Sequence, residues 1–125
     1  MALIDEIKFD SAGLVPAVTV DEKGDVLMLA YMNRESFEKT IATGKTTFFS
    51  RSRQKLWTKG EESGNVLDVI DIYLDCDGDT LVVKVKSGVP ACHMGYASCF
   101  FRKHVSGKWQ IFREKVFDPE KAYKK

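Results

Sequence analysis

Hydrophobic and polar residues along the chain form short blocks that predict β-hairpins. Residues 17–20 and 26–32 are apolar, and the segment between them, residues 21–25, is polar and contains a glycine. Two apolar runs joined by such a segment are typical of an antiparallel hairpin. A second hairpin is predicted where the β-branched and apolar residues 66–74 and 80–85 flank an acidic turn.

A short helix is indicated after the first hairpin. Asn33 is a good N-cap, Glu35 suits the positive first turn of a helix, and Gly44 can end a helix in the left-handed conformation. Phe37 and Ile41 are four positions apart, so they would share one helical face. We therefore expect a helix of about three turns between the two caps.

The remaining apolar runs complete the predicted fold. Further strands are expected at residues 46–50, 100–105 and 109–112, the last two joined by a Ser-Gly turn. The elements together predict an α+β fold, mostly antiparallel sheet with one or two short helices. No repeat or linker divides the chain, so residues 1–125 are expected to form a single domain.

Composition places the chain among globular proteins. It has 125 residues, of which 44% are hydrophobic and 30% charged, enough for one buried core. A domain of this size leaves a large share of its apolar surface in water, so a homodimer is a reasonable expectation.

Charge and hydropathy restrict the partners of the protein. Nineteen basic and eighteen acidic residues give a net charge of +1, which argues against nucleic-acid binding through overall positive potential. No segment approaches the roughly 18 apolar residues of a membrane span. The first residues do not resemble a secretion signal. We therefore expect a cytoplasmic protein with no membrane and no nucleic-acid partner.

Two familiar motifs fail on inspection. Gly44 and the two residues after it resemble the end of a P-loop, but Lys39 stands where the first glycine of that loop is required. Alternate aspartates from Asp75 onward resemble an EF-hand, but Lys86 stands where the bidentate glutamate is required. Neither a P-loop nor an EF-hand is predicted.

The acidic turn is a candidate site for a hard cation. Asp75, Asp77 and Asp79 alternate along a segment whose side chains would point to one side, so the three carboxylates could share Mg²⁺. An acidic turn can equally be a solvated loop without any ion.

The three cysteines, Cys76, Cys92 and Cys99, are candidate zinc ligands. An odd number of cysteines in a chain without a signal peptide argues against a disulfide framework and favours metal or catalytic use. Three thiolates suit Zn²⁺ with a fourth position open to water, as hydrolytic chemistry requires. Each cysteine could instead be buried and inert.

Other residues near these motifs each have more than one interpretation. His93 could be a zinc ligand, a general base or a group that contacts the zinc ligands without binding the metal. His104 is more typical of a surface residue. Trp57 could be a core residue or a platform on which a base stacks. The basic side chains could be solvated charges or could bind phosphate; these are Arg51, Arg53 and Lys59.

Taken together, the motifs resemble those of the phosphoribosyl-AMP cyclohydrolases. These enzymes carry Ser-Arg-Ser-Arg, Leu-Trp-x-Lys-Gly-Glu-x-Ser-Gly, Asp-Cys-Asp-x-Asp, Ala-Cys-His and Ser-Cys-Phe segments. The chain has all five, and the similarity covers roughly residues 8–103. The matching segments are residues 50–53, 56–64, 75–79, 91–93 and 98–100.

The resemblance implies a function and a set of site residues. The three cysteines would bind zinc and the three aspartates magnesium. It also implies an intertwined homodimer in which Cys76 of one subunit completes a site with Cys92 and Cys99 of the other. The implied reaction, in histidine biosynthesis, is hydrolysis of the N1–C6 bond in the adenine ring of phosphoribosyl-AMP. Zinc would activate water and His93 would move the proton. The Mg²⁺ site and the three basic side chains could hold the two phosphates.

Two departures from the family pattern leave alternatives open. Met94 stands where threonine is expected after Cys-His, and Leu67 stands where glutamine is expected. If these residues reshape the pocket, the protein could be a paralogue that hydrolyses another nucleotide or base. A second alternative is a non-catalytic zinc module in which His93 closes a four-ligand structural site. Since the chain ends at Lys125, a fused phosphoribosyl-ATP pyrophosphohydrolase, found in many relatives, is not expected.

Overall fold

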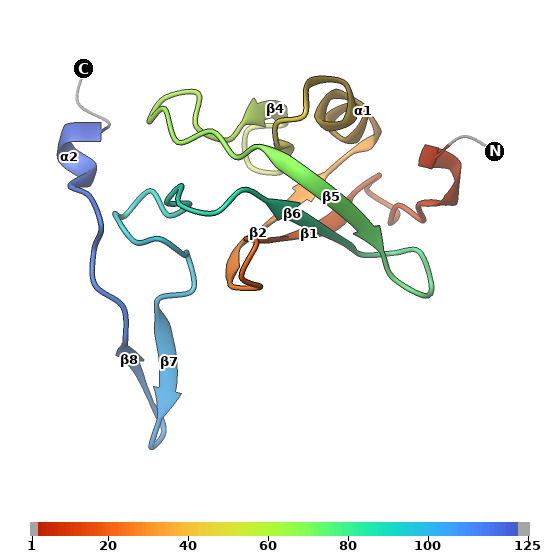
Figure 1. Cartoon of the computed structure of the whole chain (residues 1–125). Helices are drawn as coiled ribbons and strands as arrows, with labels where there is room; N and C mark the ends of the chain where they lie inside the picture. The colour runs from red at the N-terminus through yellow and green to blue at the C-terminus, as the bar shows by residue number, and fades with distance from the viewer. Residues whose placement is uncertain (1–2, 123–125) are drawn as a thin grey trace.

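The computed structural model describes residues 3–122 and has an α+β fold built on a four-stranded sheet (Figure 1). The strand order is β2-β1-β6-β5. Their bounds are β1 (Val15–Val20), β2 (Val26–Met32), β5 (Val69–Leu74) and β6 (Leu81–Val85). Both predicted hairpins, β1–β2 and β5–β6, are antiparallel, which confirms the expected class. The two hairpins join through a parallel pairing of β1 with β6 that the sequence did not predict.

The helix α1 (Arg34–Thr43) begins and ends at the predicted caps. The Asn33 side chain accepts a hydrogen bond from the Ser36 backbone N–H at 2.8 Å, and the Ser36 hydroxyl accepts one from the Asn33 N–H at 2.8 Å. Gly44 has φ of +73° and ends the helix in the left-handed conformation. This reciprocal capping satisfies backbone donors that the first turn leaves free.

The apolar face predicted for α1 is only half right. Phe37 is buried, but Ile41 is 49% exposed, and the polar Thr40 is buried instead. The Thr40 hydroxyl accepts from the Thr47 N–H at 3.0 Å, and it shares its proton between the Ser36 carbonyl at 2.8 Å and the Thr47 carbonyl at 3.1 Å. The hydrogen bonds with Thr47 turn the Thr40 side of the helix toward the next strand, which leaves Ile41 toward solvent.

Shorter elements surround the sheet. The strand β4 was not predicted, because its residues, Lys55–Thr58, mix basic, apolar and polar side chains without alternation. It pairs with β3 in a separate two-stranded sheet. The remaining elements are η1 (Leu3–Glu6), β3 (Thr47–Ser50), β7 (Arg102–Val105), β8 (Lys108–Ile111) and α2 (Pro119–Ala122).

The core lies on one face of the sheet, between the sheet and the elements α1, η1 and β3. Alternate residues of β1 and β6 point into it, as period-two burial requires. Fully or almost fully buried side chains here include Val15, Ala17, Leu81, Val83, Phe37 and Phe48.

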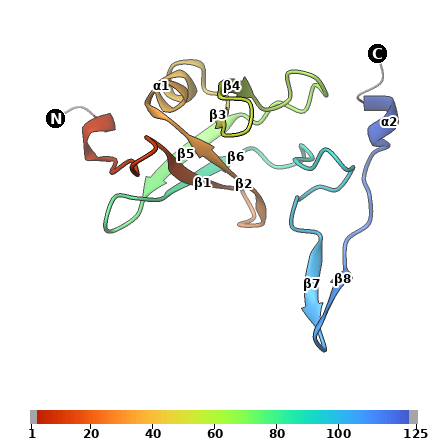
Figure 2. The same cartoon turned by 180° about the vertical axis from the view of Figure 1, so that it is seen from behind.

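A hairpin of β7 and β8 extends away from this body (Figures 1 and 2). Its turn is at Ser106 and Gly107, as predicted, and both residues have positive φ. Within the described residues, no other strand pairs with it. No helix among these residues is long and apolar enough to cross a membrane.

Candidate active site

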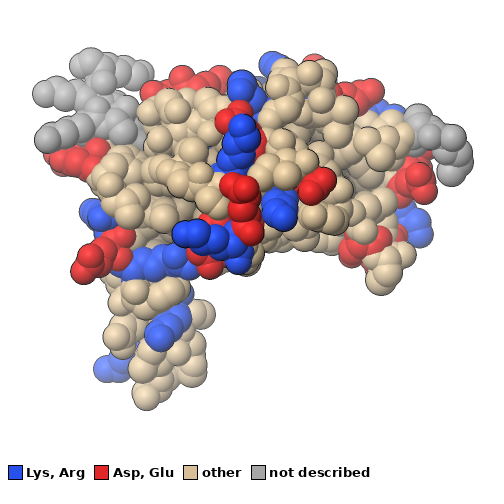
Figure 3. Space-filling model, in the orientation of Figure 1, with Lys and Arg blue, Asp and Glu red and all other residues tan. Residues whose placement is uncertain are grey.

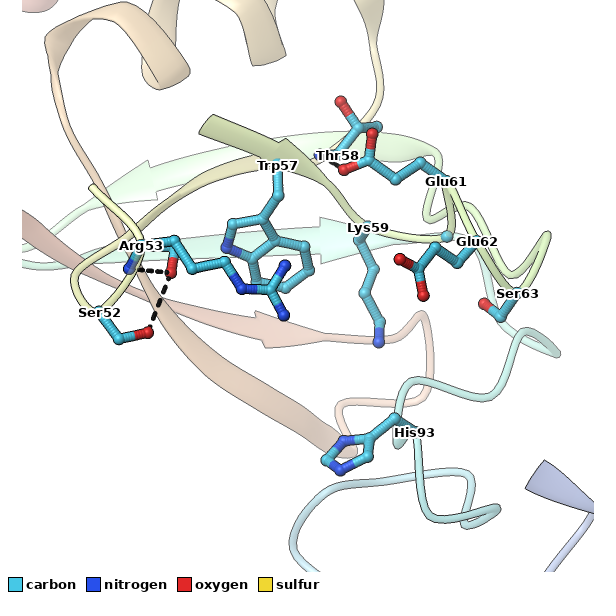
Figure 4. A pocket seen from close by; sticks show the side chains of 11 residues that line it. Ser52, Arg53, Trp57, Thr58, Lys59, Glu61, Glu62, Ser63 and His93 are labelled. Carbon is cyan, nitrogen blue, oxygen red and sulfur yellow. Dashed lines mark hydrogen bonds between the residues drawn. The ribbon is translucent and has the colours of Figure 1, made fainter. Parts of the chain in front are cut away.

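A cavity of about 500 Å³ opens beside β4 and the loop that follows it (Figure 4). Most of its lining comes from residues 50–63, and one side chain, His93, comes from a loop much later in the chain. In Figure 4, Lys59 and His93 point into the space between them. Predicted site residues that line it are Arg53, Trp57, Lys59 and His93.

The loop after β4 depends on Gly60. This residue has φ of +91°, and a Cβ atom placed on it would overlap the backbone of Asn65 and Val66. The Gly64 N–H closes the loop by donating to the Gly60 carbonyl at 2.8 Å. The loop therefore folds back tightly enough that only glycine fits, and it presents Glu61 and Glu62 to the cavity.

Trp57 both packs against the core and lines the cavity. It packs against the core, where its ring lies 5.1 Å from that of Phe48, at an interplanar angle of 44°. Its other surface lines the cavity. The core contact fixes the ring, so a flat aromatic surface is held ready beside the cavity.

Lys59 is the most buried charged side chain of the site, at 8% exposure. Desolvation lowers its pKa, although the thiols of Cys99 and Cys92 oppose that shift. Among the described residues, no carboxylate lies within ion-pair distance of its amine. A buried cation without a carboxylate partner is suited to receive an anion or to face thiolates.

Arg51 does not join the other basic residues. Its guanidinium stacks over the Tyr31 ring, 4.0 Å from the ring centroid, and lines a separate groove next to β2. The predicted basic group of three is therefore divided, with Arg53 and Lys59 in the cavity and Arg51 in the adjoining groove. Trp57 contributes to the lining of both.

Two of the three cysteines come together in a compact loop. The Cys92 N–H donates to the Tyr96 carbonyl at 3.2 Å, and the Cys99 N–H donates to the Leu27 carbonyl at 2.7 Å, which fastens the loop to the start of β2. Desolvation and the neighbouring Cys92 raise the pKa of the Cys99 thiol to about 11, while Lys59 opposes the rise. The Lys59 amine therefore interacts electrostatically with both sulfur atoms.

Cys76 lies away from this pair. It is in the turn between β5 and β6, next to the start of β6, where Leu81 pairs with Ala17. Cys99 lies near the other end of the same sheet, because its N–H donates to the Leu27 carbonyl. Leu27 directly follows the residue of β2 that pairs with Val20, the last residue of β1. Within the described chain, the three thiols do not meet as a ligand set. One copy of the protein therefore offers two thiols at one end of the sheet and the third at the other.

The three aspartates of the turn do converge. Their carboxylate oxygens lie within 4.8 Å of one another. The cause is a tight turn with Gly78 at φ of +79°, rather than the extended alternation expected from the sequence. Asp75 accepts hydrogen bonds from the backbone N–H groups of Asp79 and Thr80 at 3.0 and 3.2 Å.

The crowding of these carboxylates changes their ionisation. Hydrogen bonds and repulsion from Asp79 and Asp75 raise the pKa of Asp77. Desolvation would raise the pKa of Asp75, but hydrogen bonds from Asp77 and the backbone outweigh it and lower that pKa. Carboxylates held together against their own repulsion gain from a divalent cation, so this cluster fits Mg²⁺.

The two departures from the family pattern lie outside the cavity. Leu67 is fully buried in the hydrophobic core, and Met94 is 47% exposed. Neither is among the residues that line the cavity in the described chain. They therefore give no support for a reshaped pocket or a different substrate.

Comparison with known sequences connects these features. Residues 28–101 match the pattern of the family described as phosphoribosyl-AMP cyclohydrolase, a span that contains every predicted site residue. The chain belongs to the phosphoribosyl-AMP cyclohydrolase family. A phosphoribosyl-AMP cyclohydrolase of Pelotomaculum thermopropionicum is 54% identical over 98% of this chain and 96% of its own length. One from Chlorobium phaeovibrioides is 52% identical over 99% of this chain and 92% of its own length.

Membership of the cyclohydrolase family gives the donor atoms a context. The thiols of Cys92 and Cys99 are soft ligands suited to zinc, but two ligands do not complete a tetrahedral site.

Sequence reasoning did not single out Glu61 and Glu62 as cavity residues, although the motif Lys-Gly-Glu-x-Ser-Gly contains Glu61. The Gly60 turn could have indicated them, because it reverses the chain directly after Lys59.

Proposed function

We propose that the protein hydrolyses phosphoribosyl-AMP in histidine biosynthesis. Water adds to C6 of the adenine ring, the N1–C6 bond breaks, C6 becomes a carboxamide carbon and N1 takes up the proton. The observation that carries this proposal is a cavity lined by His93 and Lys59, where the Lys59 amine also interacts electrostatically with the Cys92 and Cys99 thiols, within the segment that matches the family.

We assign zinc to Cys92 and Cys99 of one copy together with Cys76 of a second copy. Such a site leaves the fourth zinc position open, and a bound zinc ion would lower the pKa of water and so provide a nucleophile at neutral pH. The position of Cys76 at the opposite end of the sheet supports this division. The functional unit is then a homodimer with two shared sites.

His93 is assigned to proton transfer. It directly follows Cys92, and its side chain lines the cavity. An imidazole can accept a proton from the attacking water and return it to N1 when the ring opens. Because N1 leaves C6 as part of a neutral amidine only after protonation, this second transfer is needed for turnover.

The phosphates and the base of the substrate are assigned to the remaining residues of the cavity, the adjoining groove and the aspartate cluster. Arg53 and Lys59 suit phosphate oxygens, and Arg51 in the adjoining groove adds a third cation nearby. Trp57 offers a flat surface to the base. The aspartate cluster, as a Mg²⁺ site, would bring a cation to phosphate oxygens.

We place the reaction in the cytoplasm. All three cysteines are free, and the proposed zinc site needs them reduced, a state that the reducing cytoplasm maintains.

Turnover of phosphoribosyl-AMP, followed by absorbance of the opened product, tests the proposal. We expect zinc-dependent hydrolysis, and we expect no reaction with AMP, because only the N1 substituent makes the ring cationic and C6 electrophilic. A purified, zinc-loaded protein that leaves phosphoribosyl-AMP intact would refute the assignment.

A further inference from the structure

The turn between β5 and β6, residues 75–80, is held largely by its own hydrogen bonds. The Asp75 N–H donates to the Thr80 carbonyl at 3.1 Å, and the Gly78 N–H donates to the Asp75 carbonyl at 3.1 Å. The hairpin ends in β5, which is an edge strand of the sheet. Figure 3 shows acidic side chains on the surface at the end of the molecule that carries this turn in Figure 1. Like charges on an exposed turn repel one another, so the turn needs support from outside.

One segment outside the hairpin supplies this support. The Lys8 N–H donates to the Gly78 carbonyl at 2.7 Å. Among the described residues, this is the one hydrogen bond between the turn and a segment outside β5 and β6. Gly78 is buried, whereas its neighbours Asp77 and Asp79 are exposed. The turn is therefore covered at its middle residue, and the carboxylates on both sides stay open to solvent.

The close approach of this segment requires glycine at position 78. A Cβ atom on Gly78 would lie 2.9 Å from the Glu6 carbonyl oxygen and 3.6 Å from Cγ of Lys8. Gly24, in the turn of the β1–β2 hairpin, has a similar φ of +87°. In the described chain, however, no atom beyond its chain neighbours lies within 4 Å of where its Cβ would be. Position 78 is therefore restricted to glycine by the segment that packs on it as well as by its φ.

The segment that carries Lys8 is anchored in the hydrophobic core. Ile4 and Ile7 are 8% and 7% exposed and belong to the core cluster. The Ile7 N–H donates to the Ile4 carbonyl at 3.2 Å, at the end of η1. Phe9, on the other side of Lys8, also packs against the core. Packing on both sides of Lys8 thus sets the position of its N–H.

We propose that residues 6–8 position the aspartate turn for its divalent cation. The inference rests on the proposed function, which assigns Mg²⁺ to the aspartates of this turn. The Gly78 carbonyl, bonded to Lys8, lies between Asp77 and Asp79 in the chain, so the hydrogen bond restrains the backbone that carries both carboxylates. Removing a group that holds metal ligands in place typically costs about 10- to 100-fold in metal affinity. The segment acts through the ligands and does not bind the cation itself.

Amide hydrogen exchange of the wild-type protein, measured by NMR with and without Mg²⁺, tests the inference. If the segment favours the cation-binding form of the turn, the bound cation must favour the bonded form of the segment, because coupling between two sites is reciprocal. At a Mg²⁺ concentration about ten times its dissociation constant, exchange of the Lys8 N–H should slow roughly tenfold. The control is the Gly24 N–H, which donates to the Asp21 carbonyl at 3.0 Å in another turn with carboxylates and should not respond.

Two results of this measurement would overturn the inference. The first is a Lys8 amide whose exchange is unchanged when Mg²⁺ is bound. The second is an equal slowing at Lys8 and Gly24, because the cation then acts on the whole protein rather than through the contact with the turn.

A pair of variants tests the same role from the side of the segment. Ile7→Ala removes an anchor of the segment. Leu67→Ala, the matched control, removes as many carbon atoms from the same core, before β5 and at the opposite end of that strand from the turn. Both should unfold at lower urea concentrations. By isothermal titration calorimetry of the folded full-length proteins, Mg²⁺ affinity should fall about tenfold in Ile7→Ala only, and Ile7→Val should restore it.

Equal Mg²⁺ affinities in the two alanine variants would contradict a positioning role, because a merely structural anchor lowers stability and leaves the affinity of the folded protein unchanged. The exchange measurement needs no variant, so it decides the question even where Ile7→Ala does not fold.

The outcome is separable from that of the proposed function. A protein that hydrolyses phosphoribosyl-AMP, but whose Lys8 amide does not respond to Mg²⁺, supports the function and refutes the inference. A protein whose Lys8 amide responds, but which leaves phosphoribosyl-AMP intact, does the reverse. A protein that binds no Mg²⁺ would refute the inference together with the magnesium assignment, and turnover alone would then decide the function.

Discussion

The amine of Lys59 and the thiol of Cys99 lie close enough for each to shift the pKa of the other. Lys59 follows β4, whereas Cys99 is in the loop before β7, so the fold unites two segments that are far apart in sequence. From the sequence, Lys59 could be a solvated charge or could bind phosphate. Its position gives it a further task, which is to oppose the rise in the pKa of the Cys99 thiol and so favour the thiolate that a metal requires.

Lys59→Gln should impair both tasks. We expect kcat/KM to fall by roughly 10- to 100-fold, since a charged hydrogen bond to substrate is lost. The pKa of Cys99 should rise further, because the opposing positive charge is removed. Alkylation rates of the metal-free protein against pH measure that change. Lys55→Gln, at the exposed start of β4, is the control and should change neither quantity.

Gly60→Ala should destabilise the protein through backbone overlap. The added Cβ would meet the backbone of Asn65 and Val66, so the loop must shift, at a cost of about 3 kcal/mol or more. Gly64→Ala has a similar positive φ but open space around it, so it should cost only about 1 kcal/mol. Urea unfolding of the two variants measures the difference, and equal values would contradict a packing role for Gly60.

The sequence predicted elements whose signals are local and missed those that depend on distant partners. Asn33 and Gly44 limit α1 through their own hydrogen bonds and φ, so both helix ends were predicted correctly. The parallel pairing of β1 with β6 has no local signal, because it forms only when two separate hairpins meet. Likewise, the exposure of Ile41 follows from hydrogen bonds between Thr40 and Thr47, which a periodicity of apolar residues cannot show.

The candidate site shows the same division. The aspartates were expected to converge and do so, but through a turn at Gly78 that the alternation argument did not include. Arg51 was grouped with Arg53 by proximity in sequence, yet its stacking on Tyr31 directs it to a separate groove. Side-chain direction at a loop depends on what packs there, and spacing alone does not determine it.

The aspartate cluster should make Mg²⁺ binding depend on pH. An ordinary aspartate has a pKa of about 3.9. The pKa of Asp77 is raised, so its carboxyl becomes protonated at a higher pH than that of an ordinary aspartate. Stability from the protonated form is present at low pH and is lost as the pH rises through this pKa. At neutral pH the metal-free wild type should therefore have a lower Tm than Asp77→Asn. With Mg²⁺ bound, the wild type should have the higher Tm of the two.

Thermal melts from pH 3 to 7, with and without Mg²⁺, check this prediction. The Mg²⁺-dependent rise in Tm should shrink as the pH falls through the pKa of Asp77. Asp71→Asn, on the same hairpin but outside the cluster, is the control and should keep the full Mg²⁺ response. A Mg²⁺ response that survives in Asp77→Asn at all pH values would remove the cluster as the cation site.

Mixing two inactive variants should restore activity if the zinc site is divided between copies. Cys76→Ser and Cys92→Ser each destroy both sites of their own dimer. In a mixed dimer, one site receives both defects and the other receives none. After unfolding and refolding at equal concentrations, half of the dimers are mixed, so about a quarter of wild-type activity should return. Recovery near zero would show that each copy builds its own site.

The last prediction separates the roles of two adjacent residues, Cys92 and His93. Cys92→Ser should lose most of the zinc and nearly all activity, because a serine hydroxyl does not ionise near neutrality as a metal-bound thiol does. His93→Ala should keep its zinc, and kcat should fall by roughly 10²- to 10⁴-fold as a proton-transfer group is lost. One limb of its pH–rate profile should also flatten. If His93→Ala instead loses zinc and unfolds as easily as Cys92→Ser, the histidine is a fourth ligand. The site is then closed to water, and its zinc serves the structure.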